Sequence, residues 1–203
     1  MTILSEKLRN KIRDKEARIG IIGMGYVGIP LGLEFANNGF NVLGFDKDKK
    51  RIDAINEGKQ VMKHIKQKDM ANFVANDGSA TNDISNLNEM DCLIICVPTP
   101  LDVHEQPDMS YVEAASDDIS KNMRKGQLIV LESTTYPGTT KELVKPILEK
   151  SGLIAGEDFF LAYSPEREDP GNKEFSVSKI PKVCLLYTSD AADDTPCVDL
   201  GGR

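Results

Sequence analysis

Residues 18–28 read RIGIIGMGYVG, an apolar run that passes directly into a glycine-rich turn. The run is typical of a strand buried in a sheet, and residues 27–38 follow it with helical spacing. A strand, a GxGxxG turn and a helix in this order are typical of dinucleotide sites, because free amides at a helix start hold a diphosphate. Gly23 allows the tight turn, Gly25 lets the diphosphate approach the backbone, and Gly28 lets the helix pack closely on the strand. The alternative is a glycine-rich turn without a ligand.

Similar apolar runs recur along the chain and alternate with stretches of helical spacing. The runs are residues 41–46, 91–97, 127–133 and 159–165, and the helical stretches are 27–38, 49–57, 110–122 and 139–150. Residues 73–77 (FVAND) are a weaker candidate for an additional strand. Continuous apolar strands that alternate with helices predict an α/β fold, a doubly wound, mainly parallel Rossmann-type sheet with helices on both faces. In such a sheet, ligands collect beyond the carboxyl ends of the strands.

Composition limits the classes of function. The 203 residues carry a formal net charge of −7, which argues against a nucleic-acid surface. No apolar run is long enough to span a membrane, so we expect a cytoplasmic protein without a membrane partner. Residues 1–17 predict a lead-in helix with Ile3, Leu4, Leu8 and Ile12 on its apolar face. We expect this face to pack on its own domain rather than on a partner.

The cysteines within the sequence DCLIICV are predicted to be structural. Cys92 and Cys96 lie in this apolar run, and four residues along a strand is too far for a disulfide. No histidine or further cysteine nearby supplies the spacing of a metal site. We therefore expect two buried thiols and no metal.

Asp46 ends the second apolar run, about twenty residues after the glycine turn. An acid there can accept hydrogen bonds from both ribose hydroxyls of NAD, and it would repel the 2′-phosphate of NADP. The basic residues at 47, 49, 50 and 51 could soften that repulsion, although such a run is usually a solvated helix face. We predict NAD as the cofactor, with Arg51 a candidate contact on the adenosine side.

The later apolar runs also end in polar or rigid sequences. CVPTP (96–100) holds Thr99 between two prolines, and ESTTYPGTT (132–140) places the hydroxyls of Ser133 and Thr134 at the same rim. Helix capping is an equal alternative for these hydroxyls. AYSPEREDPGN (162–172) holds three acids and an arginine, and a glutamate there could act as a general acid or base. A solvated polar loop is the alternative.

Taken together, these sequences resemble the nucleotide-sugar 6-dehydrogenases, the UDP-glucose/GDP-mannose dehydrogenase family. The resemblance covers about residues 18–182, which is essentially that family's N-terminal NAD domain, and rests on GMGYVG, FDKDKKR, CVPTP, PDMSYVEAA, ESTTYPGT and YSPEREDPGN in that order. The form SPEREDPGN resembles the branch that acts on UDP-N-acetylhexosamines, especially UDP-N-acetylglucosamine. Family members oxidise C6 of the sugar twice, from alcohol through aldehyde to acid, and reduce two NAD; the expected pathway is the synthesis of surface polysaccharide precursors.

The resemblance also implies residue roles. Glu166 would be the acid or base for the steps at C6, and Thr134 would help to place the water for the later hydrolysis. The substrate would contact Glu166, Arg167, Glu168 and Asp169. The position where the UDP-glucose branch has a second glutamate is Pro170 here, which puts the role of that second acid in doubt. The residues implied to hold NAD are Gly23, Met24, Gly25, Tyr26, Val27, Gly28, Asp46, Arg51, Val97, Pro98, Thr99, Ser133 and Thr134.

The resemblance also shows what this chain lacks. The family's second oxidation passes through a thioester on a cysteine in a GGSCxPKD-like sequence, which does not occur here. Residues 184–194 (CLLYTSDAADD) and 197–203 (CVDLGGR) instead resemble a translated sequencing-library adapter. We expect a Rossmann domain over 18–183, a disordered non-native tail over 184–203 without contacts to the sheet, and missing central and C-terminal substrate domains. The parent would form homo-oligomers through the missing central domain.

Two other functions remain open at this point. A β-hydroxyacid-type single-step dehydrogenase would need no cysteine, but the SPEREDPGN loop argues against it. A non-catalytic NAD-binding regulatory module would be a complete short chain. On the preferred interpretation, the fragment alone binds NAD at best.

Overall fold

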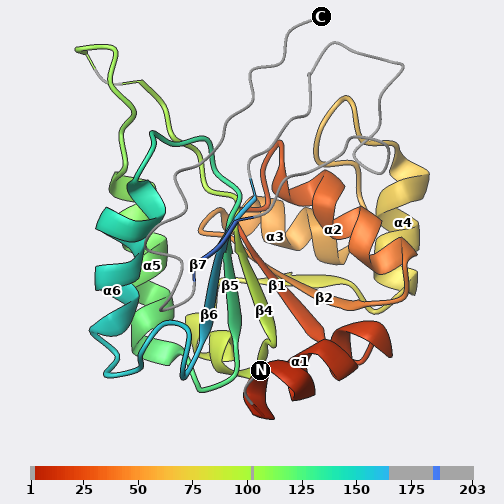
Figure 1. The fold of residues 1–203 in the computed structure, drawn as a ribbon. Helices are drawn as coiled ribbons and strands as arrows, with labels where there is room; N and C mark the ends of the chain where they lie inside the picture. The colour runs from red at the N-terminus through yellow and green to blue at the C-terminus, as the bar shows by residue number, and fades with distance from the viewer. Residues whose placement is uncertain (1–2, 102, 165–184, 188–203) are drawn as a thin grey trace, which may run out of the picture.

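The computed structural model describes residues 3–101, 103–164 and 185–187. A seven-stranded sheet in the order β3-β2-β1-β4-β5-β6-β7 forms its centre (Figure 1). The first six strands are parallel, which confirms the predicted doubly wound sheet. The strands are β1 (Arg18–Ile22), β2 (Asn41–Phe45), β3 (Ser79–Thr81), β4 (Cys92–Ile95), β5 (Leu128–Leu131), β6 (Phe160–Tyr163) and β7 (Leu185–Tyr187).

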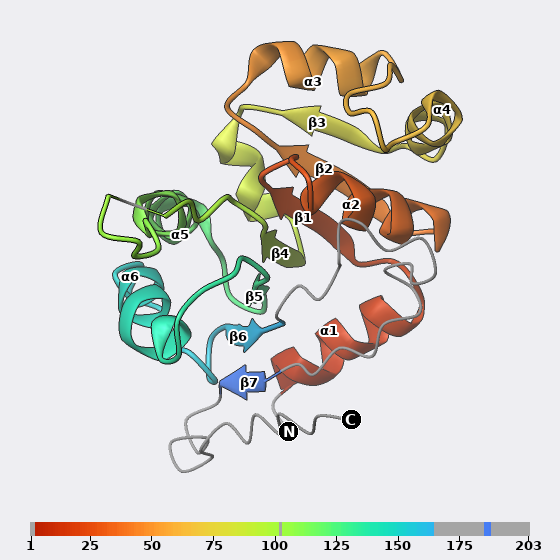
Figure 2. The ribbon, with the colours of Figure 1, turned by 90° about the horizontal axis from the view of Figure 1, so that it is seen from above.

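Helices lie on both faces of this sheet, with α2 and α4 on one side and α5 and α6 on the other (Figure 2). The helices are α1 (Ile3–Arg13), α2 (Gly28–Asn37), α3 (Lys49–Asn56), α4 (Gln67–Ala75), α5 (Ser110–Asn122) and α6 (Lys145–Glu149), with a 3-10 turn η1 (Ile84–Glu89) and a π-helical turn η2 (Thr140–Val144). Among the described residues, none of these helices has the length and apolar character to cross a membrane.

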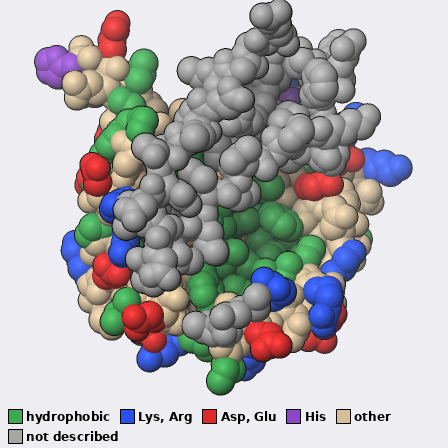
Figure 3. Space-filling view, in the orientation of Figure 1, with side chains coloured by type: hydrophobic (Ala, Val, Ile, Leu, Met, Phe, Trp, Pro, Cys, Tyr) green, Lys and Arg blue, Asp and Glu red, His purple; other side chains and the backbone are tan. Residues whose placement is uncertain are grey.

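Alternation along the strands divides the core into two apolar layers. Ile21 of β1 packs in the layer beneath α2 and α4, whereas Phe45 of β2 and Leu93 of β4 pack in the layer beneath α5. Hydrophobic side chains are visible over the middle of the sheet in Figure 3. Each fully buried side chain of this size contributes roughly 1.5–3 kcal/mol to folding, so the two layers hold the strand ends in place.

The prediction of a strand at residues 73–77 is wrong, because this stretch ends helix α4. Met70 and Phe73 are three residues apart and only 0% and 2% exposed, so they share the buried side of a helix. The strand at this edge is β3, which begins at Ser79. Its three residues, Ser-Ala-Thr, lack the apolar run on which the prediction depended.

The lead-in helix α1 packs on its own domain, as expected, but not with its whole predicted face. Leu8 is buried in the core and Leu4 packs beside it, whereas Ile3 is 86% exposed. Lys11 on the same helix lies 2.8 Å from the buried carboxylate of Asp91. Leu8, Leu4 and the ion pair of Lys11 with Asp91 therefore help to hold the helix on the domain.

Residues 185–187 contradict the prediction that the tail makes no contact with the sheet. They form β7, which pairs antiparallel with β6 in the register Leu161↔Tyr187, Ala162↔Leu186 and Tyr163↔Leu185. The physical reason is that β6 would otherwise be an edge strand with unpaired backbone groups, which an apolar segment of high strand propensity can satisfy. Residues 165–184 and 188–203 lie outside the described residues.

Candidate functional site

A cavity of about 720 Å³ lies at the carboxyl ends of the central strands. It spans the boundary between β1 and β4, where the order of the strands reverses along the sheet. Ligands of open parallel sheets bind in the crevice at this point. The volume is within the usual range of cofactor sites. The carboxyl ends of β1, β2, β4 and β5 all contribute to its lining.

The glycine turn after β1 has the geometry that a bound diphosphate needs. Gly23 has a φ of +97°, and a Cβ there would lie 2.8 Å from the carbonyl oxygen of Cys96. A Cβ on Gly28 would overlap the carbonyl oxygen of Gly23, so only glycine fits where α2 meets the turn. By contrast, a Cβ on Gly25 would meet nothing within 4 Å and would extend into open space. Backbone amides at the start of α2 thus have room for a phosphate beside them, and the residues present fit NAD.

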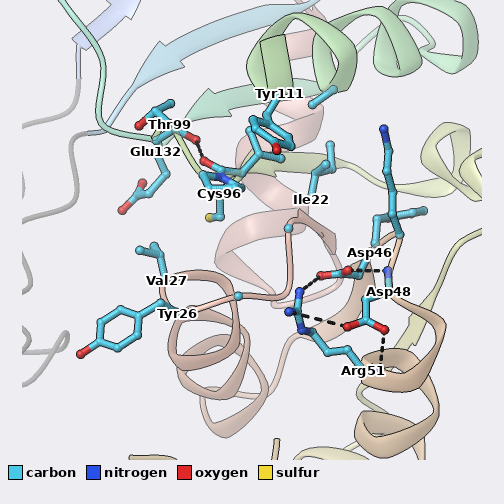
Figure 4. Close-up of a pocket in the computed structure, with 18 of the residues that line it drawn as sticks. Ile22, Tyr26, Val27, Asp46, Asp48, Arg51, Cys96, Thr99, Tyr111 and Glu132 are labelled. Carbon is cyan, nitrogen blue, oxygen red and sulfur yellow. Dashed lines mark hydrogen bonds and ion pairs between the residues drawn. The ribbon is translucent and has the colours of Figure 1, made fainter. Parts of the chain in front are cut away.

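Asp46, at the end of β2, connects the glycine turn to helix α3 (Figure 4). Its Oδ2 accepts hydrogen bonds from the amide of Met24 at 3.0 Å and from the guanidinium of Arg51 at 2.9 Å. Its Oδ1 accepts the amide of Asp48 at 2.8 Å, and Asp48 in turn caps α3. The side chain of Asp46 is 8% exposed, so the carboxylate is fixed before any ligand arrives.

Tyr26 in the glycine turn lies beside the loop that joins α3 to α4. The rings of Tyr26 and His64 have their centres 4.5 Å apart. Met62 from the same loop lines the cavity, together with Tyr26 and Val27. Gln60 stabilises the loop, since its side-chain amide donates to the carbonyl of Ile65 at 2.7 Å. The loop thereby closes one wall of the cavity.

The ends of β4 and β5 are joined by the hydroxyl of Ser133. Its Oγ donates to the carbonyl of Val97 at 2.7 Å and lies 3.2 Å from that of Ile95. Val97, Pro98, Thr99, Ser133 and Thr134 all line the cavity. Helix capping does not account for Ser133, because η2 has Thr139 as its cap residue. The predicted rim of hydroxyl groups is therefore part of one continuous wall.

The remaining predicted residues fall outside the described part of the chain. These are Glu166, Arg167, Glu168 and Asp169 of the SPEREDPGN loop, together with Pro170. The described sequence reaches Ser164, whose amide donates to the carbonyl of Leu131 at 3.0 Å. Ser164 therefore lies next to the end of β5, where Glu132, Ser133 and Thr134 line the cavity.

Several lining residues were not predicted from the sequence. Tyr111 and Asp118 come from α5, Asn82 and Ile84 follow β3, and Glu132 immediately precedes Ser133. Helical spacing predicted α5 but not which of its sides faces a ligand. Glu132 could have been found, because it is an acid at the carboxyl end of an apolar run.

The two cysteines among the described residues lie in β4 and directly after it. Cys92 and Cys96 are both buried, as predicted, and they do not form a disulfide with each other. Burial raises the pKa of Cys92 to about 12, and the nearby Asp91 adds to this effect. The described ranges contain no group of three or more residues arranged to hold a metal ion.

The sequence of this chain is similar to those of known nucleotide-sugar dehydrogenases. Residues 17–193 match the UDP-glucose/GDP-mannose dehydrogenase family, NAD binding domain, a range that includes the first part of the proposed tail. The UDP-N-acetyl-D-glucosamine 6-dehydrogenase of Pseudomonas aeruginosa is 40% identical over 180 residues, which cover 88% of this chain and 42% of that protein. The UDP-N-acetyl-D-mannosamine dehydrogenase of Escherichia coli K12 is 35% identical over 176 residues, 82% of this chain and 41% of that protein.

Solved structures of nucleotide-sugar dehydrogenases also match this chain. The NDP-N-acetyl-D-galactosaminuronic acid dehydrogenase of Methanosarcina mazei superposes with a TM-score of 0.73 at 37% identity, over 83% of this chain and 38% of that one. A ternary complex of GDP-mannose dehydrogenase from Pseudomonas aeruginosa superposes with a TM-score of 0.69 at 31% identity, over 74% and 36% of the two chains. The chain thus spans about two-fifths of the length of these relatives.

Proposed function

This chain belongs to the UDP-glucose/GDP-mannose dehydrogenase family and carries its NAD-binding domain, and on that premise we propose that its full-length form oxidises a UDP-N-acetylhexosamine at C6. We further propose that the 203-residue chain itself binds NAD without completing the reaction. NAD, when bound, accepts hydride from C6. The residues of this chain would hold the cofactor and form part of the wall beside the sugar.

The observation that carries the proposal is the pairing of an open glycine turn with a fixed acid in one cavity. Gly25 leaves room beside the backbone for the diphosphate, and Asp46 lies next to it, since its Oδ2 accepts the Met24 amide. A diphosphate on the turn would bring the adjoining ribose toward this carboxylate. Arg51, already bonded to Asp46, would then lie on the adenosine side.

The sugar class is supported by the relatives. Proteins named as dehydrogenases of UDP-N-acetyl-D-glucosamine and of UDP-N-acetyl-D-mannosamine match at 40% and 35% identity. We propose UDP-N-acetylglucosamine as the substrate, supported by two relatives of that name at 40% and 37% identity and by the SPEREDPGN sequence. Thr134, which lines the cavity, would help to place the water for the later hydrolysis, and Glu166 would serve as acid or base.

Two experiments test these steps separately. Calorimetric titration of the purified chain with NAD should show saturable binding to one site, and no saturable binding at millimolar cofactor would refute the dinucleotide site. The full-length protein should then produce two NADH per molecule of UDP-N-acetylglucosamine, and more slowly or not at all from UDP-glucose. A single NADH per sugar would favour a single-step dehydrogenase instead.

A further inference from the structure

Glu132 is a buried acid in the cavity that none of the roles above uses. Glu132 directly follows β5 and is only 3% exposed. Figure 4 shows its side chain beside Thr99, away from Asp46 and Arg51. Its amide donates to the carbonyl of Ile95 at 3.0 Å, so the backbone beneath the carboxylate is fixed to β4. A carboxylate in this position interacts electrostatically with any group that binds in that half of the cavity.

The order of the strands indicates which half of NAD would bind beside Glu132. Asp46 follows β2 and Glu132 follows β5, and the order β2-β1-β4-β5 places three strand spacings between them. Strands lie about 4.8 Å apart, so the two acids are separated by about 14 Å across the sheet. A dinucleotide whose adenosine ribose meets Asp46 and whose diphosphate lies on the Gly25 turn therefore extends its nicotinamide toward β4 and β5. Glu132 lines the nicotinamide end of the cavity.

The charges of the lining residues differ between these two ends. Among the described lining residues, the cationic ones are Lys47 and Arg51, which follow β2 at the adenosine end. The acids Asp46 and Asp48 accompany them there, whereas the described lining residues at the end of β5 include the acid Glu132 and neither of these cations. The nicotinamide ring of NAD⁺ carries a positive charge, whereas the ring of NADH is neutral. An acid at this end therefore favours the oxidised cofactor.

We propose that Glu132 is a specificity-determining residue that favours NAD⁺ over NADH through its carboxylate. Interactions between charges are stronger in a buried site than in water, because less solvent screens them. The carboxylate thus contributes to binding of the cationic ring and contributes little to binding of the neutral one. The consequence for the proposed reaction is that reduced cofactor is released more readily than oxidised cofactor is lost. The inference rests on NAD binding in the proposed function.

The test compares dissociation constants for both cofactors in the 203-residue chain and its Glu132→Gln variant. Glutamine keeps the shape of the side chain and removes the charge. We expect the affinity for NAD⁺ to fall by about tenfold and the affinity for NADH to change by less than twofold. The chain contains no tryptophan, so NADH fluorescence reports binding without energy transfer from that residue, and calorimetry gives the NAD⁺ value.

Controls separate charge from structure. Glu113→Gln makes the same chemical change on the exposed side of α5 and should change neither constant. Glu132→Asp keeps the charge and should retain the preference for NAD⁺. If Glu132→Gln does not fold by circular dichroism, Glu132→Ala provides the neutral comparison.

The possible outcomes are distinct. Equal losses for NAD⁺ and NADH in the neutral variant would assign Glu132 a purely structural role and overturn the inference, as would no change in either constant. Failure of the unaltered chain to bind either cofactor would instead refute the proposed NAD site, before Glu132 is considered.

Discussion

The guanidinium of Arg51 is hydrogen-bonded to Asp46, the acid that directly follows β2, and its Nη1 lies 2.9 Å from Oδ2 of Asp46. The same guanidinium lies 3.9 Å from the carboxylate of Asp48, so two acids hold it at the adenosine end of the cavity. An arginine in this place can serve either cofactor: it positions Asp46 for the ribose of NAD, or it could face the 2′-phosphate of NADP if the acid were absent. The balance between the two cofactors thus depends on the pair.

We expect Asp46→Ser to shift the preference of the chain toward NADP. The change removes the charge that repels the 2′-phosphate and frees Arg51 to bind it, so the ratio of NADP to NAD affinity should rise by at least about tenfold. Calorimetric dissociation constants for both cofactors measure this ratio. Adding Arg51→Ala should cancel the gain, and a gain that persists without the arginine would show that the guanidinium does not face the phosphate.

Two alanine substitutions in the glycine turn should have opposite effects. Gly25→Ala places a methyl group in open space, so thermal stability should change by less than about 2 °C, whereas NAD affinity should fall by at least about tenfold. Gly28→Ala would place a methyl group against the carbonyl of Gly23, so we expect a loss of several kcal/mol of folding free energy. Melting curves and NAD titrations measure both effects. Undiminished NAD binding by the Gly25 variant would mean that the diphosphate lies elsewhere.

Some of the structural features behind these predictions could be predicted from the sequence, and others could not. The strand, turn and helix around Gly23–Gly28 were predictable, because the glycine spacing and the long apolar run are local patterns. Strand β3 was not, because Ser-Ala-Thr becomes a strand only by pairing with β2. The aromatic and β-branched residues of FVAND suggested a strand, but packing of Phe73 and Met70 on the same side decided for a helix. Tertiary packing overrode local propensity in this case.

The residues that line the cavity also divide into some that were predictable from the sequence and some that were not. Asp46, Thr99 and Ser133 were predictable because each lies at the end of an apolar run or within two residues of it. Tyr111 lies on a helix whose apolar spacing predicts its buried side but not which exposed residues face the cavity. Glu132 has a local signal, because it is an acid at the end of an apolar run, but its burial depends on the neighbouring strand and loop. Residues that line a site through tertiary contacts alone carry no local signal.

Asp91 should make the stability of the fold sensitive to acid. Its carboxylate accepts hydrogen bonds from Lys11, from the amide of Arg18 and from Arg124, at 2.8, 3.1 and 2.8 Å. Burial alone would raise the pKa of Asp91, but these bonds outweigh burial and hold the pKa below its ordinary value of 3.8. A carboxyl whose pKa is lowered by folding stabilises the fold above the unfolded pKa and loses that contribution as the pH falls through the folded pKa.

We therefore expect the free energy of unfolding to decrease between about pH 4 and pH 2, and Asp91→Asn to weaken this decrease. At pH 7 the variant should lose about 1–3 kcal/mol, because the bonds to both cationic partners weaken. Urea unfolding at several pH values measures both effects. Asp14→Asn is the matched control, since Asp14 forms an exposed ion pair with Arg13 and its replacement should leave the free energy of unfolding almost unchanged. An equal loss in the two variants would contradict the role of Asp91.

Cys92 should be inert toward thiol reagents in the folded chain. Burial raises its pKa to about 12, so almost no thiolate is present at pH 8, and the reagent cannot reach the sulfur. Peptide mass spectrometry after iodoacetamide treatment should find Cys92 unlabelled in buffer and fully labelled in urea. Prompt labelling of Cys92 in buffer would indicate that the sheet opens at β4 far more often than its burial implies.

The last prediction concerns β7, whose three residues pair with β6. None of the described residues that line the cavity belongs to β6 or β7. A chain that ends at residue 183 should therefore bind NAD within about twofold of the longer chain and melt within about 4 °C of it. Leu186→Pro in the 203-residue chain tests the same pairing without truncation, because proline removes a backbone donor from the strand. If both changes reduce NAD affinity by tenfold or more, then β7 is a functional part of the domain, and the interpretation of residues 184–203 as a non-native tail is wrong.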